Sequence, residues 1–488
     1  MSLCLSNPVQ IKKNEPLQEI NKFINNIKSI TKRYQSFEQI EQYTKMLMNK
    51  LESAILTESL EQYDIHTKVI IKDGKLYRHV LREEKTYFAC AGKISVERSL
   101  YRGPDGTNIC PLELQAGIIE SSWTPSAARS AYYVTAQLSP YQGENLFKEL
   151  GRFTPSKSSL DRLSRKIGRQ WDSKHDEFFN SLSNNIIIPE DAVCISASFD
   201  GIMLPMKTKK IIKEADDKKA KPEETEKIEY KNKENKKGTE TKEEKAKPLY
   251  KEAACAAVCF YNDKGERLST IRFARMPEAK KKTLKNELSE TVEQILTQKD
   301  NLILVKLADG ARDNWRYLGD ILRPGEGVEV LDFFHASEHL NKAIEAIYKK
   351  GSPECISHFK QYRSLLKHDE IGVVKVIRTL RYFHKKFPKR KVILTELNYF
   401  KNNRRRMNYA LMAAKNYPIG SGVTEASCKT LVTQRLKCSG MRWDIAGGQG
   451  VLTARSLIQS GRFEAGWSLL AQSYTGEITL PKNVVLLN

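Results

Sequence analysis

Two short apolar stretches near the middle of the chain decide its fold. They read Val193-Cys-Ile-Ser-Ala-Ser-Phe-Asp-Gly-Ile-Met-Leu204 and Ala253-Ala-Cys-Ala-Ala-Val-Cys-Phe-Tyr261. Runs of this length and composition predict strands that lie inside a sheet. A third strand is expected at 267–273, because Asp263-Lys264-Gly265 between it and the second is typical of a hairpin turn.

Strand and helix patterns alternate after this hairpin. Three successive strands followed by helix, strand, helix and strand is the order of an RNase H-like core, in which an antiparallel meander is extended by parallel crossovers. The predicted fold class is mixed α/β: an RNase H-like catalytic core with a helical insertion, preceded by helical and small β N-terminal regions. The expected elements after the hairpin are a helix at 282–297, a strand at 302–307, a helix at 311–322, a strand at 328–331 and a helix at 336–348.

Composition divides the chain further. Residues 207–248 contain 15 lysines and 11 acidic residues with scarcely any large apolar side chain. Such a segment buries too little surface to offset its ordering entropy, so it is predicted to be a mobile spacer. The predicted regions are amphipathic helices at 1–66, a small β region at 67–110, a helical region at 111–175, the first part of the core at 190–340, a basic helical insertion at 341–412 and the second part of the core at 413–475.

The helical region contains a pattern typical of a helix-turn-helix. Residues 144–150 and 156–168 are expected to form two helices joined at Gly151, and the second carries Lys157, Arg162, Arg165 and Lys166. This helix could lie in the major groove of DNA. An ordinary pair of core helices joined at a glycine explains the pattern equally well.

The charge of the chain favours a polyanionic partner. Its formal net charge is +22, and residues 358–442 hold 20 lysines and arginines against four acidic residues. Neutralising phosphates with such a surplus releases counterions and favours nucleic acid binding. A solvated basic face or contact with an anionic membrane surface would also use this charge.

Two function classes fit the sequence poorly. No run of about 20 apolar residues is present, so a membrane-spanning protein is not expected. The nine cysteines include no Cys-x-x-Cys pair, which argues against a zinc ribbon and against a disulfide framework. A reducing cytoplasmic location is predicted.

Three carboxylates occupy informative positions in the predicted core. Asp200 is expected at the end of the first strand, Asp309 at the end of the fourth, and Glu425 in the first turn of a helix at about 422–437. In an RNase H-like core these three positions converge, and carboxylate oxygens suit Mg²⁺ or Mn²⁺. Each residue alone has an ordinary explanation, because Asp-Gly is a common turn and an acidic residue near a helix start complements the helix dipole.

Four segments resemble the ISKra-type bacterial insertion-sequence transposases, which are DDE enzymes related to the Mutator-like group. The resemblance covers about residues 195–470. Its longest and most specific segment is the last one, at 417–443. The segments are Phe199-Asp-Gly-Ile-Met203, Ala308-Asp-Gly-Ala311, Leu331-Asp-Phe-Phe-His-Ala-Ser-Glu-His-Leu340 and Tyr417-Pro-Ile-Gly-Ser-Gly-Val-Thr-Glu-Ala-Ser-Cys-Lys-Thr-Leu-Val-Thr-Gln-Arg-Leu-Lys-Cys-Ser-Gly-Met-Arg-Trp443.

The resemblance implies an enzyme that cuts DNA at element ends and joins them to target DNA. It implies that Asp200, Asp309 and Glu425 are the triad holding two Mg²⁺ or Mn²⁺ ions, that Asp332 and His335 form a supporting Asp-x-x-His signature, and that the protein acts as a homo-oligomer on double-stranded DNA. Asp332 is the main competitor for a place in the triad, since it also follows a strand.

Basic residues around the predicted site are expected to contact phosphates, although a solvated helix face is the alternative for each of them. Two other functions remain open: an RNase H-like nuclease that does not join strands, and a non-catalytic DNA-binding protein derived from a transposase. The predicted DNA contacts are Arg404, Arg405, Arg406, Lys429, Arg435, Lys437 and Arg442.

Overall fold

The computed structural model describes residues 25, 36–151, 153–207 and 249–481. Most of the predicted N-terminal helices before Ser36 and nearly all of the charged stretch 207–248 lie outside the described residues. No helix in the part described has the length and apolar character needed to cross a membrane. The chain divides into two compact units, unit 1 (1–129, 144–155 and 474–488) and unit 2 (130–143 and 156–473).

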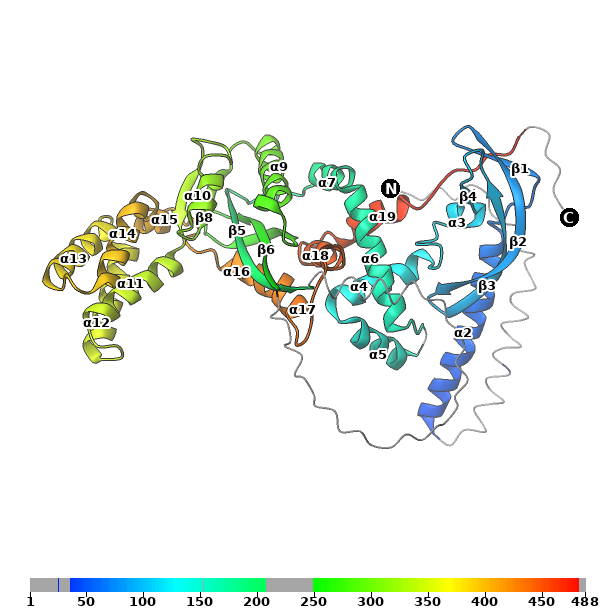
Figure 1. Cartoon of the computed structure of the whole chain (residues 1–488), viewed down its shortest axis with the longest axis horizontal. Coiled ribbons are helices and arrows are strands. Elements are labelled where there is room, and N and C mark those ends of the chain that lie inside the picture. The colour runs from blue at the N-terminus through cyan, green and yellow to red at the C-terminus, as the bar shows by residue number, and fades with distance from the viewer. Residues whose placement is uncertain (1–24, 26–35, 152, 208–248, 482–488) are drawn as a thin grey trace, which may run out of the picture. The chain divides into compact units, whose positions relative to one another are not determined.

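Unit 1 is built on an antiparallel four-stranded sheet (Figure 1). A hairpin turn joins the first two strands, with Asp73 and Gly74 both at positive φ, as a tight two-residue turn requires. Leu56 and Leu60 of helix α2 pack with Ile94 and Val96 of the sheet. The elements are α2 (Phe37–Glu61), β1 (Val69–Lys72), β2 (Lys75–Ala89), β3 (Gly92–Arg102), β4 (Asn108–Ile109) and α3 (Pro111–Gln115).

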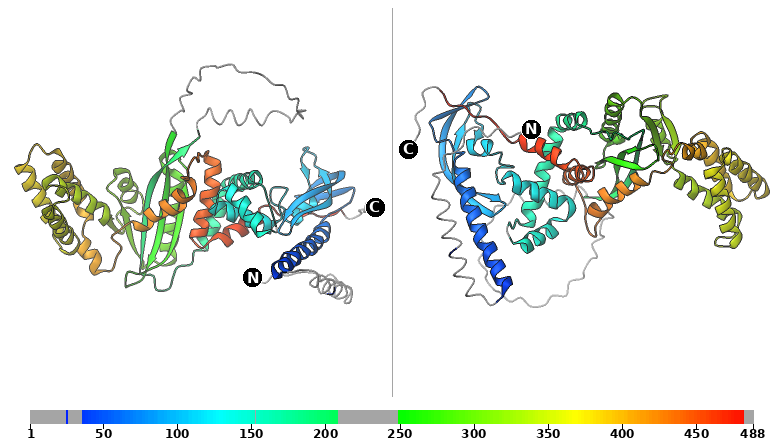
Figure 2. Two further views of the ribbon diagram at one scale, coloured as in Figure 1. Left: turned by 90° about the horizontal axis from the view of Figure 1, so that it is seen from below. Right: turned by 180° about the vertical axis from the view of Figure 1, so that it is seen from behind.

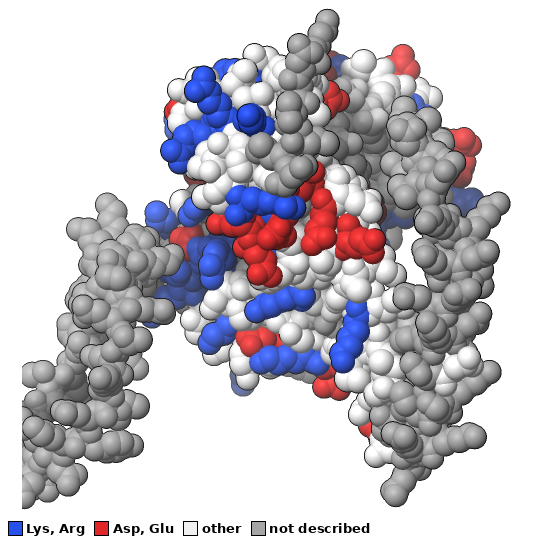
Figure 3. Space-filling view, turned by 90° about the vertical axis from the view of Figure 1, so that its right-hand side faces the viewer, with Lys and Arg blue, Asp and Glu red and all other residues white. Residues whose placement is uncertain are grey.

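Ion pairs link neighbouring elements of unit 1. Arg98 on β3 pairs with Glu83 on β2 at 2.8 Å and with Glu113 on α3 at 2.9 Å. The face of the molecule drawn in Figure 3 likewise carries acidic side chains among basic ones. The basic excess of the chain is therefore not concentrated on that face.

Unit 2 contains a mixed five-stranded sheet in the order β7-β6-β5-β8-β9 (Figure 1). The first three strands in sequence pair antiparallel, and β8 and β9 join them in parallel. This is the strand order of an RNase H-like core, and the predicted mixed α/β fold class is confirmed. The strands are β5 (Cys194–Met206), β6 (Leu249–Tyr261), β7 (Arg267–Arg275), β8 (Ile303–Ala308) and β9 (Val328–Leu331).

Strand β6 shows why the Ala-Ala-Cys-Ala-Ala run forms a strand. Ala254 and Ala256 belong to the apolar cluster that includes helix α9 (Lys282–Gln298), whereas Ala253 and Cys255 belong to the cluster under the C-terminal helices. Both faces of β6 are thus covered, which explains an apolar run without polar alternation. Small side chains let helices on both faces approach the sheet closely.

The remaining helices of unit 2 follow the predicted order with shifted bounds (Figure 2). The helix expected at 422–437 is interrupted, because residues 428–433 form a π-helical turn between α16 and α17. These helices are α6 (Lys157–Ser173), α7 (His175–Asn184), α10 (Arg312–Leu318), α11 (Phe333–Ile347), α12 (Pro353–His368), α13 (Gly372–Lys386), α14 (Lys391–Asn403), α15 (Tyr409–Ala414), α16 (Gly422–Ser427), α17 (Gln434–Leu436), α18 (Ile445–Gln459) and α19 (Phe463–Gln472); α4 (Pro125–Gln137) and α5 (Pro140–Leu150) cross the boundary between the units.

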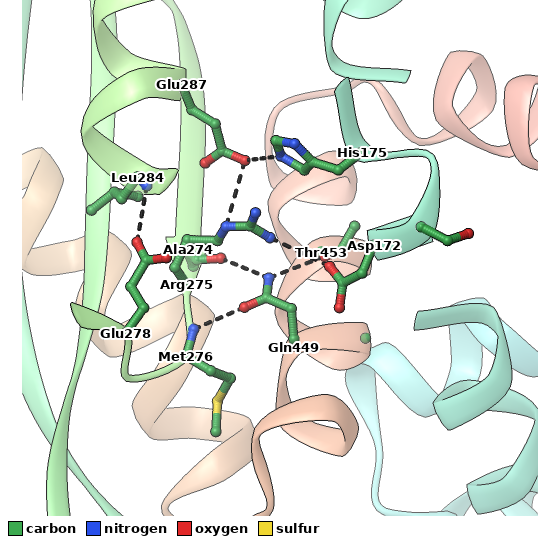
Figure 4. Close-up of polar contacts among 12 residues, drawn as sticks. Asp172, His175, Ala274, Arg275, Met276, Glu278, Leu284, Glu287, Gln449 and Thr453 are labelled. Carbon is green, nitrogen blue, oxygen red and sulfur yellow. Dashed lines mark hydrogen bonds and ion pairs between the residues drawn. The ribbon is translucent and has the colours of Figure 1, made fainter. Parts of the chain in front are cut away.

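Helix α18 protects the free edge of β7. Gln449 accepts a hydrogen bond from the backbone N–H of Met276 at 2.8 Å and donates to the carbonyl of Ala274 (Figure 4). Ser460, just after the helix, accepts from the N–H of Arg272. The outward backbone groups at Arg272 and Ala274 are therefore paired, which hinders pairing of this part of the edge with another chain.

A cluster of charged side chains joins α6 and α7 to this part of the sheet. His175 contacts Glu287 of α9 at 2.8 Å, and Arg275 of β7 lies 3.7 Å from Glu287 and 3.6 Å from Asp172 (Figure 4). The hydrogen bond that His175 donates to Glu287 raises the pKa of His175. Opposite charges thus compensate one another where the helices meet the core.

Helix α6, the predicted recognition helix, packs against α18. A Cβ added at Gly168 would lie 2.7 Å from the Cα of Gly450, so the two glycines permit a close helix crossing. Arg165 pairs with Asp444, the N-cap of α18, at 2.5 Å. This packing accounts for the apolar face of α6 and for Arg165, and DNA recognition by α6 stays a prediction.

Candidate active site

Asp200 lies within a strand and not at its end. β5 continues to Met206 in register with β6, so the prediction that Asp200 ends the first strand is wrong. Pairing with β8 stops at Ser198 and Leu307, however, and Asp200 and Asp309 each follow two residues later. At Asp200, β5 therefore no longer pairs with β8, and that edge of the strand is unpaired in the sheet.

Asp309 directly follows β8 and forms hydrogen bonds in the turn before the next helix. Its Oδ1 accepts hydrogen bonds from the N–H of Ala311 at 3.0 Å and from Asn314 Nδ2 at 2.9 Å. These two bonds form a turn before α10, whose N-cap is Ala311, so Asp309 does not cap the helix itself. It uses one carboxylate oxygen, and no hydrogen-bond donor to the other is found among the described residues.

Glu425 is held over the sheet by its neighbour. Thr424 is wholly buried, and its hydroxyl forms a short hydrogen bond with the hydroxyl of Ser198 on β5. This bond ties the first turn of α16 to the strand that carries Asp200. Glu425 itself stays about half exposed, at 49% for its side chain, as a group that meets a substrate must be.

The carboxylates are close enough to affect one another's ionisation. Burial and the charge of Asp309 raise the pKa of Asp200, while His335 and Lys281 oppose the shift. Burial and the charges of Asp332 and Asp200 raise the pKa of Glu425. Burial together with neighbouring negative charge marks a place where a bound cation would be stabilised.

A second grouping involves Asp332, His335 and Glu425. One ligand atom of each lies within 4.8 Å of the other two. His335 Nε2 is 3.3 Å from Glu425 Oε1, and His335 Nδ1 is 3.7 Å from Glu338. His335 therefore contacts Glu425, the predicted third acid.

Asp332 already has hydrogen-bond partners for both of its oxygens. It is wholly buried, and its Oδ1 accepts from the backbone N–H of His335 at 2.8 Å, capping α11. Its Oδ2 accepts from the N–H of Ser421 and, at 2.7 Å, from the hydroxyl of Ser421. These bonds hold the Gly420-Ser421-Gly422 turn that leads into α16, so they favour a supporting role over a place in the triad.

Sequence reasoning missed a residue that closes one wall of this region. A Cβ added at Gly310 would lie 2.5 Å from the Tyr399 ring, so the glycine leaves room for that ring. Tyr399 stacks on His339 with ring centroids 3.6 Å apart, and His339 contacts Glu396 at 2.6 Å. The Asp-Gly pair was the only signal available, and it suggested a turn.

One predicted DNA contact is wrong. Arg435 is only 2% exposed, donates to the carbonyl of Thr135 at 3.1 Å and lies 5.3 Å from the centre of the Trp443 ring. Burial lowers its pKa to about 10. Its guanidinium is occupied inside unit 2, so it cannot reach a phosphate in this arrangement.

The other predicted DNA contacts lie at least partly at the surface of unit 2. Arg406 is partly engaged, since it pairs with Glu329 at 2.6 Å and lies over the Trp315 ring at 4.2 Å. Their contact with DNA stays a prediction. The exposed members are Arg404, Arg405, Lys429, Lys437 and Arg442.

Comparisons with known proteins give little beyond this geometry. No protein-family model matches the chain. No curated protein sequence matches it either. Among solved structures the chain is similar to the Drosophila P element transposase strand transfer complex, with 12% identity and a TM-score of 0.25, over 72% of this chain and 83% of that chain. At this TM-score the two backbones coincide only loosely, and the site is assigned from the chain's own residues.

Proposed function

We propose that this protein is a DNA transposase of the ISKra type, which cuts DNA at the ends of an insertion sequence and joins the freed 3′ ends to target DNA. The observation that carries the proposal is the arrangement of three carboxylates. Asp200 and Asp309 follow the last paired residues of neighbouring parallel strands, and the Ser198–Thr424 bond brings Glu425 over the same sheet. Burial and nearby carboxylates raise the pKa values of Asp200 and Glu425, which supports a common site.

The donor set fits hard divalent cations. Asp200, Asp309 and Glu425 would hold Mg²⁺ or Mn²⁺, whose preferred ligands are carboxylate oxygens. A pair of such ions supplies activation of the attacking oxygen and stabilisation of the leaving oxygen in an in-line displacement. Mn²⁺ is an acceptable alternative to Mg²⁺, because both ions prefer carboxylate and water oxygens.

The protein's own groups would position the acids. His335 Nε2, 3.3 Å from Glu425, can donate to that carboxylate and orient it. Asp332 holds the turn before α16 through its hydrogen bond with Ser421. This bond would fix the position of Glu425 relative to β5. Such support matters because a displacement of about 1 Å can lower a rate about 100-fold.

The proposal implies double-stranded DNA as partner, both as element ends and as target. Two ends must be brought together, so the active form would be a homo-oligomer on nucleoid DNA in the cytoplasm. The surplus of basic residues between 358 and 442 supports a DNA partner.

The decisive experiment compares Glu425→Gln with a matched variant, Glu338→Gln. Both residues are exposed glutamates that contact His335, but only Glu425 belongs to the proposed triad. Purified proteins are incubated with labelled duplexes from the borders of the encoding element and with a target plasmid, with Mg²⁺ or Mn²⁺ and with EDTA. We expect metal-dependent joined products for the wild type and for Glu338→Gln, and none for Glu425→Gln.

Each other outcome selects a different function. Metal-dependent cutting without joined strands across several border sequences would indicate a nuclease. Site-specific binding without any cutting would indicate a DNA-binding protein that has lost catalysis. Joined products from Glu425→Gln would remove Glu425 from the triad.

A further inference from the structure

A groove beside helix α12 lies apart from the carboxylates. Its volume is about 590 Å³, and it lies between the end of α11 and one face of α12. Ile356 and Phe359 supply its apolar surface. The complete lining is Asn341, Glu345, Lys350, Gly351, Cys355, Ile356, Phe359, Lys360, Arg363, Ser364, Lys367 and His368.

The groove is strongly basic because of helical spacing. Phe359, Arg363 and Lys367 follow one another at intervals of four residues, so they form one row on α12. Lys360 begins the adjacent row. Among the described residues, no carboxylate lies within ion-pair distance of Lys360, Arg363 or Lys367.

The single carboxylate of the lining is already neutralised. Glu345 pairs with Lys350 at 3.4 Å. Three lysine and arginine charges are therefore left without a counter-charge in a concave surface, where they attract anions more strongly than on a convex one. His368, at the end of α12, adds a further positive group when protonated.

Two cations of the groove lie over the ring of the first residue of α11. The Arg363 guanidinium lies 5.0 Å from the centre of the Phe333 ring, and Lys367 Nζ lies 6.0 Å from it. Phe333 directly follows Asp332 and begins α11. This row of cations on α12 therefore extends towards the start of α11, which Asp332 precedes.

We infer that this groove binds the sugar–phosphate backbone of duplex DNA and holds it next to the carboxylates. Rows of cations on a helix contact phosphates without reading sequence. The Phe359 ring is partly buried against the apolar core, which leaves less of it open for the stacking of unpaired bases. The inference rests on the proposed function, and it assigns the DNA-holding role of the basic insertion to this particular surface.

The test measures how DNA binding depends on salt. One variant carries Lys360→Ala, Arg363→Ala and Lys367→Ala, and affinity for a 30-base-pair duplex is measured from 50 to 200 mM salt without divalent metal. Each phosphate contact contributes about 0.9 to the slope of log affinity against log salt, so we expect the slope to fall by about 2.7. Over this range, the wild type would lose about 40-fold more affinity than the variant.

The matched control removes three exposed cations from another helix of the same insertion, with Arg378→Ala, Arg381→Ala and Lys385→Ala on α13. Its slope should stay close to that of the wild type. Because Arg363 packs on Phe333, a second variant with only Lys360→Gln and Lys367→Gln keeps that contact, and its slope should fall by about 1.8.

An unchanged slope in both groove variants would overturn the inference, as would an equal loss in the α13 control. Loss of binding to duplex RNA or polyglutamate, with duplex DNA binding unchanged, would also overturn it, because the occupant would then be another polyanion. Metal-dependent cutting is measured separately. A groove effect in a protein that never cuts DNA would reject the proposed function alone, whereas cutting with an unchanged slope would reject the groove alone.

Discussion

Replacing Asp332 by Asn separates the two roles that this residue could have. The side chain is wholly buried, with one oxygen capping α11 at the N–H of His335 and the other accepting two hydrogen bonds from Ser421. Asn has a single acceptor oxygen. If that oxygen keeps the cap, the amide group faces the N–H of Ser421 and leaves it without an acceptor.

The expected loss of stability follows from this change in hydrogen bonding. Asn and Asp are equally good helix N-caps, so the cap at His335 should change little. A buried N–H without a partner costs about 1–3 kcal/mol, and loss of a charged acceptor adds about 1 kcal/mol. We therefore expect the turn at Ser421 to lose about 2–4 kcal/mol of local stability. Amide hydrogen exchange at Ser421 should become about 30- to 900-fold faster.

Hydrogen exchange of the Asp332→Asn protein is compared with that of Asp313→Asn, which changes an exposed acid in the first turn of α10. Strand cutting should also fall about 100-fold in Asp332→Asn, because Glu425 follows the loosened turn. Unchanged exchange at Ser421, together with weaker Mn²⁺ binding by the folded protein, would refute this reasoning. Asp332 would then be a metal ligand and not a positioning residue.

Two further predictions test buried charges. Burial alone would raise the pKa of Asp444, but hydrogen bonds from Arg165 and Gly447 lower it to about 2. The ionised Asp444 carboxylate therefore stabilises the fold fully above its ordinary pKa near 3.8, and this stabilisation is lost as the pH falls through about 2. We expect Asp444→Asn to lower the free energy of unfolding by about 2 kcal/mol at pH 7 and by much less at pH 2. An equal loss at both pH values would contradict this prediction. Arg435→Met should leave the salt slope of DNA binding unchanged, whereas exposed Lys437→Met should lower it by about 0.9; a fall of that size in Arg435→Met would return Arg435 to the DNA surface.

The sequence by itself was sufficient for the strand order of the core. Apolar runs of strand length, the turn at 263–265 and the alternation of helices and strands after it are local patterns. They predicted the five strands of unit 2 to within a few residues, because side-chain periodicity reports which faces are buried. The position of Asp309 directly after β8 followed from the same pattern to within one residue.

Bounds that depend on a neighbouring element were not predictable in this way. The apolar pattern around Asp200 continues past it, and only the shorter partner strand β8 makes its position an open edge. The π-helical turn after α16 depends on Arg455 of α18, whose guanidinium donates to the carbonyls of Thr430 and Leu431. The helical repeat around residues 422–437 does not reveal that Arg455 donates to these carbonyls.

The tertiary structure alone decided which polar groups belong together. Ser198 and Thr424 are 226 residues apart, and Asp332 and Ser421 are 89 apart, yet each pair forms a buried hydrogen bond. Arg435 is a basic residue in a basic stretch, but its side chain lies in the interior. There its guanidinium contacts a backbone carbonyl and an aromatic ring and does not face a phosphate. Burial and pairing depend on which distant segments pack together, whereas a local pattern specifies only the element that each residue enters.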